Sequence, residues 1–235
     1  MTIPIFRITG LILLISLVVL YPRLAAAQSP SDAAQIVDNI VRAYGGRAAL
    51  ERMHGVRHSG QIQSYRLGKT GTLSRLFVLP GRLRVDLNYS DGPSEQRITT
   101  ADGAWRDGRP ATAPMHLAMQ LQSARFRLPL LLTEGPTTLL GKSEGRLHLQ
   151  MPLTDTTSME VLVDPASWRI VRSMGQMNFN GMRMAFTADY SDFRNVDGVL
   201  FAHREELAAM GMPTGIATLE RIEVNPDFGP LDFKP

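Results

Sequence analysis

The clearest helical pattern of this chain lies near its start, over residues 32–44. Apolar side chains recur there at intervals of three and four residues, which is the period of one helix face. Ser31 or Asp32 can cap the first turn, and Gly45 and Gly46 end the run. A shorter helix is predicted over residues 47–53. The apolar face of the first helix consists of Ala33, Ile36, Val37, Ile40, Val41 and Tyr44.

From Val56 onwards the apolar positions recur at every second residue, which is the period of a strand. The run 82–89 alternates strictly between polar and apolar side chains. Turn sequences rich in Gly, Asp and Pro separate such runs. Antiparallel strands are therefore predicted at short intervals on both sides of an interruption at residues 111–134. Their ranges are 56–66, 72–79, 82–90, 95–101, 104–106, 137–142, 145–151, 158–164, 169–175, 182–190, 199–207 and 215–224.

The interruption at residues 111–134 is predicted to be helical and is unusually apolar. Pro114 suits the first turn of a helix that begins after Thr112, and residues 128–132 form a second apolar stretch. A helix at the surface normally keeps one polar face, which this segment largely lacks. Many short strands with few helices predict one curved or barrel-like antiparallel sheet.

The first 27 residues have the layout of a secretory signal peptide. Arg7 precedes an apolar run at residues 11–20, and three alanines end at Ala27. The apolar run is about 13 residues long even when it starts at Ile8, whereas a membrane-spanning helix needs about 20. We therefore expect cleavage after residue 27 and no stable transmembrane segment in residues 28–235.

Removal of this segment changes the charge of the protein. The 235-residue chain has 25 Lys and Arg against 22 Asp and Glu, a net charge of +3. Arg7 and Arg23 leave with the signal, so 23 basic and 22 acidic residues remain, and no basic run points to a nucleic-acid partner. A hydrophobic content of 44% without an internal linker predicts one folded domain over residues 28–235. The absence of Cys excludes a disulfide, a Cys-ligated metal and an acylated N-terminal cysteine.

No catalytic or metal-binding motif stands out. His54 and His58 have the spacing of helical zinc ligands, but Gly55 lies between them at a helix–strand junction. Glu205 and Glu206 are adjacent, so on a strand they face opposite sides and cannot form a dyad. We therefore predict a non-enzymatic protein with no metal and no cofactor. The five histidines, expected on exposed strand faces, are His54, His58, His116, His148 and His203.

Methionine is the most unusual feature of the composition. The chain has 12 Met, a flexible and polarisable side chain that adaptable apolar binding surfaces use often. Ordinary core filling is the alternative. Clustering on the apolar helix and on neighbouring strands favours a cavity that holds a lipid-sized ligand. The clusters are Met115 and Met119; Met174, Met177, Met182 and Met184; and Met210 and Met212.

Several short motifs, in their order along the chain, resemble the periplasmic lipoprotein-carrier superfamily, the LolA/LolB-like proteins. The first motif is the amphipathic helix at residues 36–46. Residues 80–85, Pro-Gly-Arg-Leu-Arg-Val, are similar to the family's Pro-x-(Lys/Arg)-x-Arg strand, and residues 102–105, Asp-Gly-Ala-Trp, to its Asp-Gly-x-x-(Trp/Leu) turn. Residues 163–170 and 190–201 resemble two later strand–turn–strand segments. The resemblance covers nearly all of the chain after residue 27.

This resemblance implies a mainly β fold with α elements: a single unclosed antiparallel β-barrel of about eleven strands, with an N-terminal helix, a central helical lid at residues 111–134 and an apolar cavity. It also implies a Gram-negative periplasm. An arginine latches the lid in these carriers, and Arg84 lies in the matching strand, although its alternation places it opposite Leu83 and Val85. The residues expected in the cavity and lid are Leu83, Val85, Leu87, Trp105, Met115, Met119, Phe126, Leu130, Met182 and Met184.

Two functions follow from these patterns. The first is a soluble periplasmic protein that holds acyl chains of a lipid or lipoprotein, for transport to or sensing at the outer membrane, with an envelope membrane protein as donor or acceptor. The alternative is a partner-binding subunit of a cell-envelope complex whose barrel is packed solid. An enzyme acting on an envelope lipid would need a nucleophile or base that the sequence does not identify.

Overall fold

The structure is a computed structural model that describes residues 30–229 and 231–235, so the predicted signal peptide lies outside the described residues. Helix α1 spans Pro30–Ala43 and α2 spans Arg47–Arg52, close to the predicted ranges. The apolar face predicted for α1 is buried. Gly45 lies between the two helices at a φ of +109°, and a Cβ there would lie 2.0 Å from the backbone oxygen of Gly198. Only glycine fits this close approach.

Thirteen strands and two further helices make up the rest of the described chain. The first group of strands is β1 (Gly55–Ser64), β2 (Lys69–Val78), β3 (Arg82–Tyr89), β4 (Ser94–Thr100), β5 (Gly103–Arg106) and β6 (Arg109–Pro110). The helices α3 (Ala113–Arg125) and α4 (Leu128–Glu134) follow. The second group is β7 (Thr138–Ser143), β8 (Arg146–Pro152), β9 (Thr157–Val163), β10 (Ile170–Phe179), β11 (Met182–Val196), β12 (Val199–Ala209) and β13 (Met212–Val224).

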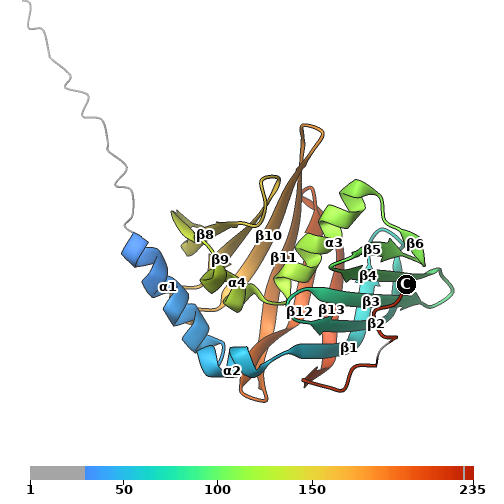
Figure 1. Cartoon of the computed structure of the whole chain (residues 1–235), viewed down its shortest axis with the longest axis horizontal. Coiled ribbons are helices and arrows are strands. Elements are labelled where there is room, and N and C mark those ends of the chain that lie inside the picture. The colour runs from blue at the N-terminus through green and yellow to red at the C-terminus, as the bar shows by residue number, and fades with distance from the viewer. Residues whose placement is uncertain (1–29, 230) are drawn as a thin grey trace, which may run out of the picture.

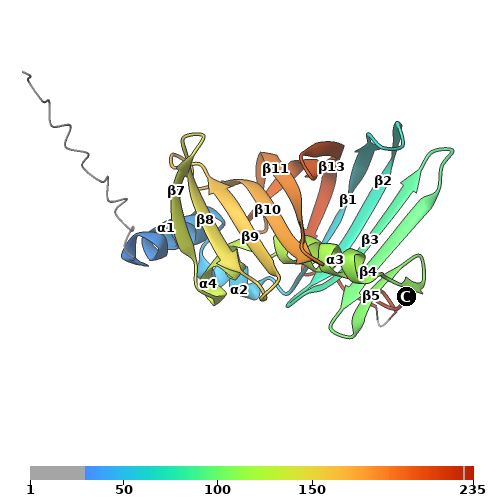
Figure 2. The same ribbon diagram turned by 90° about the horizontal axis from the view of Figure 1, so that it is seen from above.

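All thirteen strands belong to one antiparallel sheet, in the order β6-β5-β4-β3-β2-β1-β13-β12-β11-β10-β9-β8-β7. The chain runs from β1 out to one edge, crosses through α3 and α4 to the other edge, and returns until β13 pairs with β1 (Figures 1 and 2). The edge strands β6 and β7 lie at opposite ends of this order, so the barrel is unclosed. The predicted fold class is confirmed, with thirteen strands in place of about eleven. The two-residue β6 is too short for an alternating pattern to reveal.

The pairing of β1 with β13 joins the two halves of the sheet. Its register shifts between Ser59 and Gly60, which is a β-bulge. A Cβ on Gly60 would lie 2.0 Å from the backbone oxygen of Thr218, so the two strands approach each other too closely for any side chain at that position. This junction between β1 and β13, called the seam below, therefore depends on a glycine. The sequence alone shows only an interrupted strand pattern at that position.

The helix α3 lies across one face of the sheet (Figure 2). It contacts β4 and β5 on one side of the seam and β9 and β10 on the other. A single helix can touch strands so far apart in the sheet order only when the sheet curves around it. This face is therefore concave, and α3 with α4 occupies the position predicted for a lid. The segment of α3 and α4, residues 113–134, is called the lid below.

Two apolar clusters lie on opposite faces of the sheet. The main one fills the concave face and includes Phe77, Leu83 and Leu132, together with buried residues of α1 and α2. The smaller one lies on the convex face, where Leu76, Val78 and Ile98 pack with Trp105 and with Phe228 and Phe233 of the C-terminal segment. The chain end thus covers an apolar patch that the alternation of β2 would otherwise leave on the outside of the sheet.

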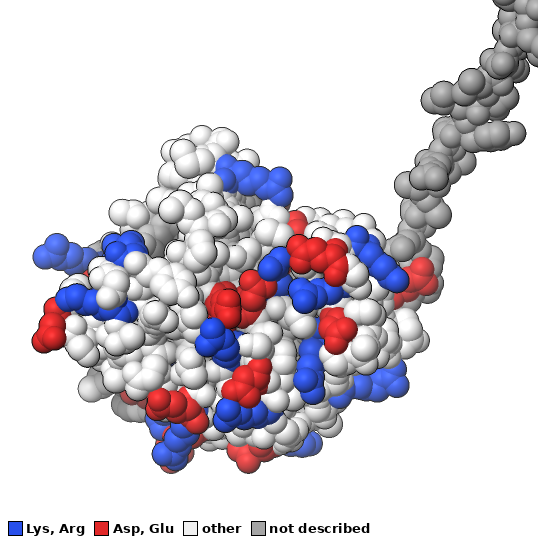
Figure 3. All heavy atoms as spheres, turned by 180° about the vertical axis from the view of Figure 1, so that it is seen from behind, with Lys and Arg blue, Asp and Glu red and all other residues white. Residues whose placement is uncertain are grey.

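No helix among residues 30–229 and 231–235 is long and apolar enough to cross a membrane. On the face seen in Figure 3, basic and acidic side chains are interspersed and do not gather into a patch of one sign. This agrees with the near balance of charge in residues 28–235.

Candidate functional site: a cavity under the lid and a buried charge cluster

The larger of two cavities under the lid has a volume of about 510 Å³ and lies between α3 and the concave face. Its volume falls within the range of about 300–1,000 Å³ that is typical of small-molecule sites. Both halves of the sheet contribute apolar walls, and α3 of the lid forms a further wall. The main apolar wall residues are Ile62, Leu73, Val85, Leu87, Met184 and Phe186, with Met115, Ala118 and Met119 from α3.

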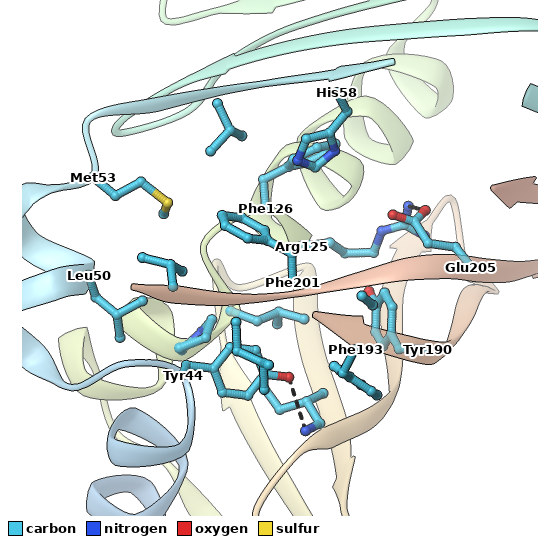
Figure 4. A pocket seen from close by; sticks show the side chains of 17 residues that line it. Tyr44, Leu50, Met53, His58, Arg125, Phe126, Tyr190, Phe193, Phe201 and Glu205 are labelled. Carbon is cyan, nitrogen blue, oxygen red and sulfur yellow. Dashed lines mark hydrogen bonds and ion pairs between the residues drawn. The ribbon is translucent and has the colours of Figure 1, made fainter. Parts of the chain in front are cut away.

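The smaller cavity, of about 90 Å³, lies beside the junction of α3 and α4. Figure 4 shows its aromatic walls, which include Phe126 of the lid, Phe201 of β12 and Tyr44 after α1. The backbone N–H of Ile170 donates a hydrogen bond to the Tyr44 hydroxyl at 3.2 Å, and burial raises the pKa of that hydroxyl above its usual range. Arg125 lines both cavities, so the two cavities meet at this residue.

The structure brings most of the predicted cavity residues together. Val85, Leu87, Met115, Met119 and Met184 line the larger cavity. The apolar pattern therefore selected residues from β3, β11 and the lid that meet in space, although they lie far apart in the chain. Phe126 lines the smaller cavity, and Leu83 and Leu130 belong to the main core around both cavities.

Two of the predicted residues lie on the convex face, which corrects the expectations for them. Trp105 packs in the smaller apolar cluster against the C-terminal segment. Arg84 donates to Asp86 at 2.7 Å and to the backbone oxygen of Asp232 at 3.3 Å. Because Arg84 points away from Leu83, it cannot latch a lid on the concave face. The alternation along β3 already indicated this placement.

Met182 also lies away from the cavities. It is 62% exposed at the turn between β10 and β11, and Met210 and Met212 are exposed at the turn between β12 and β13. The methionines that cluster in the sequence therefore lie in two different environments, the cavity walls and the ends of hairpins. Sequence spacing cannot separate them, because the difference depends on where each strand leaves the sheet.

A cluster of charged side chains is buried between the lid and the sheet. Arg75 Nη1 of β2 donates to Glu205 Oε1 of β12 at 2.7 Å, and Arg125 Nη2 of the lid lies 3.7 Å from Glu205 Oε2. The side chains of Arg75, Arg125 and Glu205 are 3%, 11% and 9% exposed. We name these three residues the charge cluster. Glu206 faces outward, so the prediction that Glu205 and Glu206 lie on opposite sides is confirmed.

Burial opposes ionisation of Glu205, but Arg75 and Arg125 outweigh it and lower the pKa of this carboxyl from 4.5 to about 2. Glu205 is therefore an anion at neutral pH and serves as an ion-pair partner rather than a proton acceptor. One carboxylate faces two guanidiniums, so the charge cluster carries one excess positive charge.

The expectation that the histidines lie on exposed strand faces is wrong for His58 and His203, which are both buried. His203 Nδ1 lies 2.7 Å from the backbone oxygen of Leu219. His58 packs against Phe126 at 5.5 Å and Phe201 at 6.0 Å between ring centroids, and neither of its ring nitrogens has a hydrogen-bond partner. Burial first, and then Arg75, lower the pKa of His58 from 6.5 to about 3. This imidazole is neutral at physiological pH.

The sequence carries a signal for this cluster that motif searches do not use. Arg75 occupies an inward position of β2, in register with the buried Leu73 and Phe77. His58 similarly shares the inward face of β1 with Val56 and Ile62. A charged or polar side chain within a run of inward apolar positions indicates a buried partner. The partner itself, Glu205, is 130 residues from Arg75 and cannot be found by spacing.

Replacement of His58 by Phe is expected to make the stability of the protein less sensitive to pH. Below pH 6.5 the unfolded chain binds a proton on His58 that the folded chain, with its pKa of about 3, does not bind. Stability therefore falls as pH drops from about 6.5 towards 3, by at most about 1.4 kcal/mol per pH unit. His58→Phe should abolish this slope between about pH 6.5 and pH 5, as measured by urea unfolding.

The exposed His54 provides the matched control. His54→Gln should keep the pH dependence of the unmodified protein. A His58→Phe variant with the same slope as the unmodified protein would contradict the buried, neutral state of His58.

Polar contacts from three residues of the lid also hold it to the sheet. Ser123 Oγ donates to the backbone oxygen of Gly81 at 2.8 Å, and Arg97 of β4 donates to Gln122 at 3.3 Å. Arg125 adds the ion pair with Glu205. The lid thus contacts both halves of the sheet through side chains, and its position over the larger cavity is fixed from both sides.

Within the part of the chain that the structure describes, no three His, Asp or Glu side chains are grouped so that they could hold a metal ion. The buried polar groups between the lid and the sheet include an ion-paired carboxylate, two guanidiniums and a neutral imidazole. Guanidiniums are strong donors to carboxylate and phosphate oxygens.

No protein-family model matches the sequence, and no curated protein matches it. Among solved structures, the chain is similar to an outer membrane lipoprotein-sorting protein domain from Vibrio parahaemolyticus, with 12% identity, a TM-score of 0.49, and coverage of 87% of this chain and 97% of that one. A DUF1329 family protein from Desulfovibrio piger is similar at 11% identity and a TM-score of 0.48, with 88% and 98% covered. A LolA superfamily protein from Nitrosomonas europaea is similar at 9% identity and a TM-score of 0.48, with 89% and 99% covered.

Proposed function

We propose that this protein is a non-enzymatic periplasmic binding protein that holds acyl chains of a lipid or lipoprotein in the larger cavity, for transport to or sensing at the outer membrane. The observation that carries this proposal is the cavity of about 510 Å³ between the lid and the concave sheet. Apolar side chains from both halves of the sheet and from α3 line it. An acyl chain placed there would remove much of its surface from water.

The signal-peptide pattern of residues 1–27 supports export of the protein, and it lies outside the described residues. Export to a periplasm would place the protein between two membranes, where an apolar cavity can shield acyl chains from water. Donor and acceptor would then be envelope membranes or membrane proteins.

The alternative, a partner-binding subunit with a solid barrel, finds support in the exposed methionines at two hairpin ends. Met182, Met210 and Met212 are 62%, 53% and 71% exposed. Exposed apolar side chains at neighbouring turns can contact another protein. The volume of the larger cavity favours the binding protein over this alternative, because a solid barrel would leave no such space.

The test is native mass spectrometry of the gently purified protein, which should show a co-purified acyl lipid. Met115→Asp should reduce the bound fraction at least tenfold, because it places a charge on the cavity wall, where the side chain is half-buried. Met119 is unsuitable for this test, because at 2% exposure an aspartate would unfold the lid.

Gln120→Asp is the matched control, since it introduces the same charge on the exposed side of α3. It should leave the bound fraction unchanged. An empty protein that also takes up no added lipid would overturn the proposal.

A further inference from the structure

We propose that the cavity selects an acyl chain that ends in an anionic headgroup, a carboxylate or a phosphate, and that this group pairs with Arg75 and Arg125. The inference rests on the proposed function and names the class of amphiphile that the cavity holds. It comes from the charges around the larger cavity, which do not balance.

Basic side chains outnumber acidic ones along the cavity. Among the described residues that line it, four are arginines, and one, Glu95, is acidic. Glu95 is shared by Arg97 at 2.6 Å and by Arg106 at 3.3 Å. Glu205 is likewise shared within the charge cluster. Each carboxylate thus faces two guanidiniums. The four lining arginines are Arg66, Arg75, Arg97 and Arg125.

The charge cluster also has unused hydrogen-bonding capacity. The Nε atoms of Arg75 and Arg125 are buried and have no hydrogen-bond partner, and Glu205 Oε2 accepts no hydrogen bond. The Arg75 side chain is only 3% exposed, so bulk water cannot supply a hydrogen-bond acceptor for its Nε–H group. Buried guanidinium groups normally have oxygen acceptors, and an anionic headgroup would supply both the acceptors and the missing negative charge.

The position of these arginines fits one end of an elongated ligand. Both line the larger cavity, and Arg125 also lines the smaller one, so the charge cluster lies where the two cavities meet. The walls of the larger cavity beyond it are formed by apolar residues such as Leu73, Val85 and Phe186. A small soluble anion would leave these walls uncovered, and a neutral lipid would leave the guanidiniums unpaired. A single-chain amphiphile with an anionic end satisfies both.

The experiment compares three probes on the protein without its signal peptide: oleate, oleoyl lysophosphatidate and methyl oleate. Affinity is measured by titration at about pH 8, where the carboxylic acid is ionised. Oleate or lysophosphatidate should bind at least about tenfold more tightly than methyl oleate, because a charge-assisted hydrogen bond at a buried site has roughly that effect. Whether the carboxylate or the phosphate binds more tightly identifies the source of the headgroup.

Arg125→Gln should reduce this preference to within about threefold. Arg221→Gln removes one positive charge from a side chain that is 73% exposed, and it should keep the preference. This control separates the charge cluster from net charge.

If methyl oleate binds to the unmodified protein as tightly as both anionic probes, this inference is overturned and the acyl-binding function still stands. Binding of none of the three probes would overturn both. The comparison on the unmodified protein does not depend on whether Arg125→Gln folds.

Discussion

Glu205→Gln is expected to lower the free energy of unfolding by about 3–5 kcal/mol, which is a large part of the stability of an ordinary domain. The change removes the one negative charge from the charge cluster and leaves Arg75 and Arg125 buried without a counter-ion. Their side chains are 3% and 11% exposed, so water cannot replace the carboxylate. Most of this loss of stability comes from leaving two buried cations without a counter-ion. The net stabilisation by the ion pair itself is the smaller part.

Urea unfolding at neutral pH measures this effect, and Glu206→Gln is the matched control. Glu206 is the next residue of β12, its side chain is 56% exposed, and its change should cost less than about 0.5 kcal/mol. A loss below about 1 kcal/mol for Glu205→Gln would contradict a dry charge cluster. Replacing Arg75 by Met in the same chain should restore part of the stability, because only one unpaired cation then remains.

Lowering the pH of the unmodified protein should reproduce this loss of stability. The pKa of Glu205 in the folded protein, about 2, lies below its usual 4.5, so its stabilising effect is present above about pH 4.5. The effect disappears as the pH falls through this interval towards 2. The contribution of His58 is lost over a different interval, from about pH 6.5 down to 3, which allows the two groups to be separated by their variants.

Phe126→Ala is expected to release the lid while most of the sheet stays folded. The Phe126 ring stacks on Phe77 of β2 at 5.3 Å and packs at a tilt against His58 at 5.5 Å, and the Arg75 guanidinium lies over it at 5.6 Å. The ring is thus an apolar contact between the lid and both β1 and β2. Its truncation should cost about 3 kcal/mol, and the loss should fall on the segment that it anchors.

Hydrogen–deuterium exchange of the backbone amides of residues 113–134 tests this expectation. Exchange in the lid should become at least tenfold faster in Phe126→Ala, while the amides of β9 and β10 keep most of their protection. Phe233→Ala is the control, because Phe233 is also an aromatic residue packed in an apolar cluster, but that cluster lies on the convex face. It should lower overall stability without a selective effect on the lid. Uniform acceleration in both variants would show that Phe126 is ordinary core.

The sequence determined much of this protein because the relevant patterns are local. A period of two fixed which residues of β3 share a face, so Leu83, Val85 and Leu87 lie together on the concave side and Arg84 on the other. The helical period fixed the buried face of α1, and the apolar interruption fixed the position of the lid. These patterns depend on backbone geometry within a few residues and need no knowledge of distant partners.

The tertiary structure alone decided which of these faces forms a cavity. Trp105 and Met182 have the same apolar character as Val85 and Met184, yet the first packs on the convex face and the second lies at a hairpin end. The position of each side chain depends on the order of the strands in the sheet and on the curvature of the sheet around α3. The sequence of a single strand indicates neither the strand order nor the curvature.

The same limit applies to the charge cluster, whose pairing no local pattern of the sequence reveals. Arg75, Arg125 and Glu205 lie on β2, the lid and β12, and they meet only because β13 pairs with β1 and the lid crosses the seam between the two halves. The sequence predicted which residues face inward, because alternation is a local property. Only the pairing of distant strands, together with the lid that crosses them, could decide that Arg75 and Arg125 share the carboxylate of Glu205, since long-range contacts leave no trace in the spacing of the residues that make them.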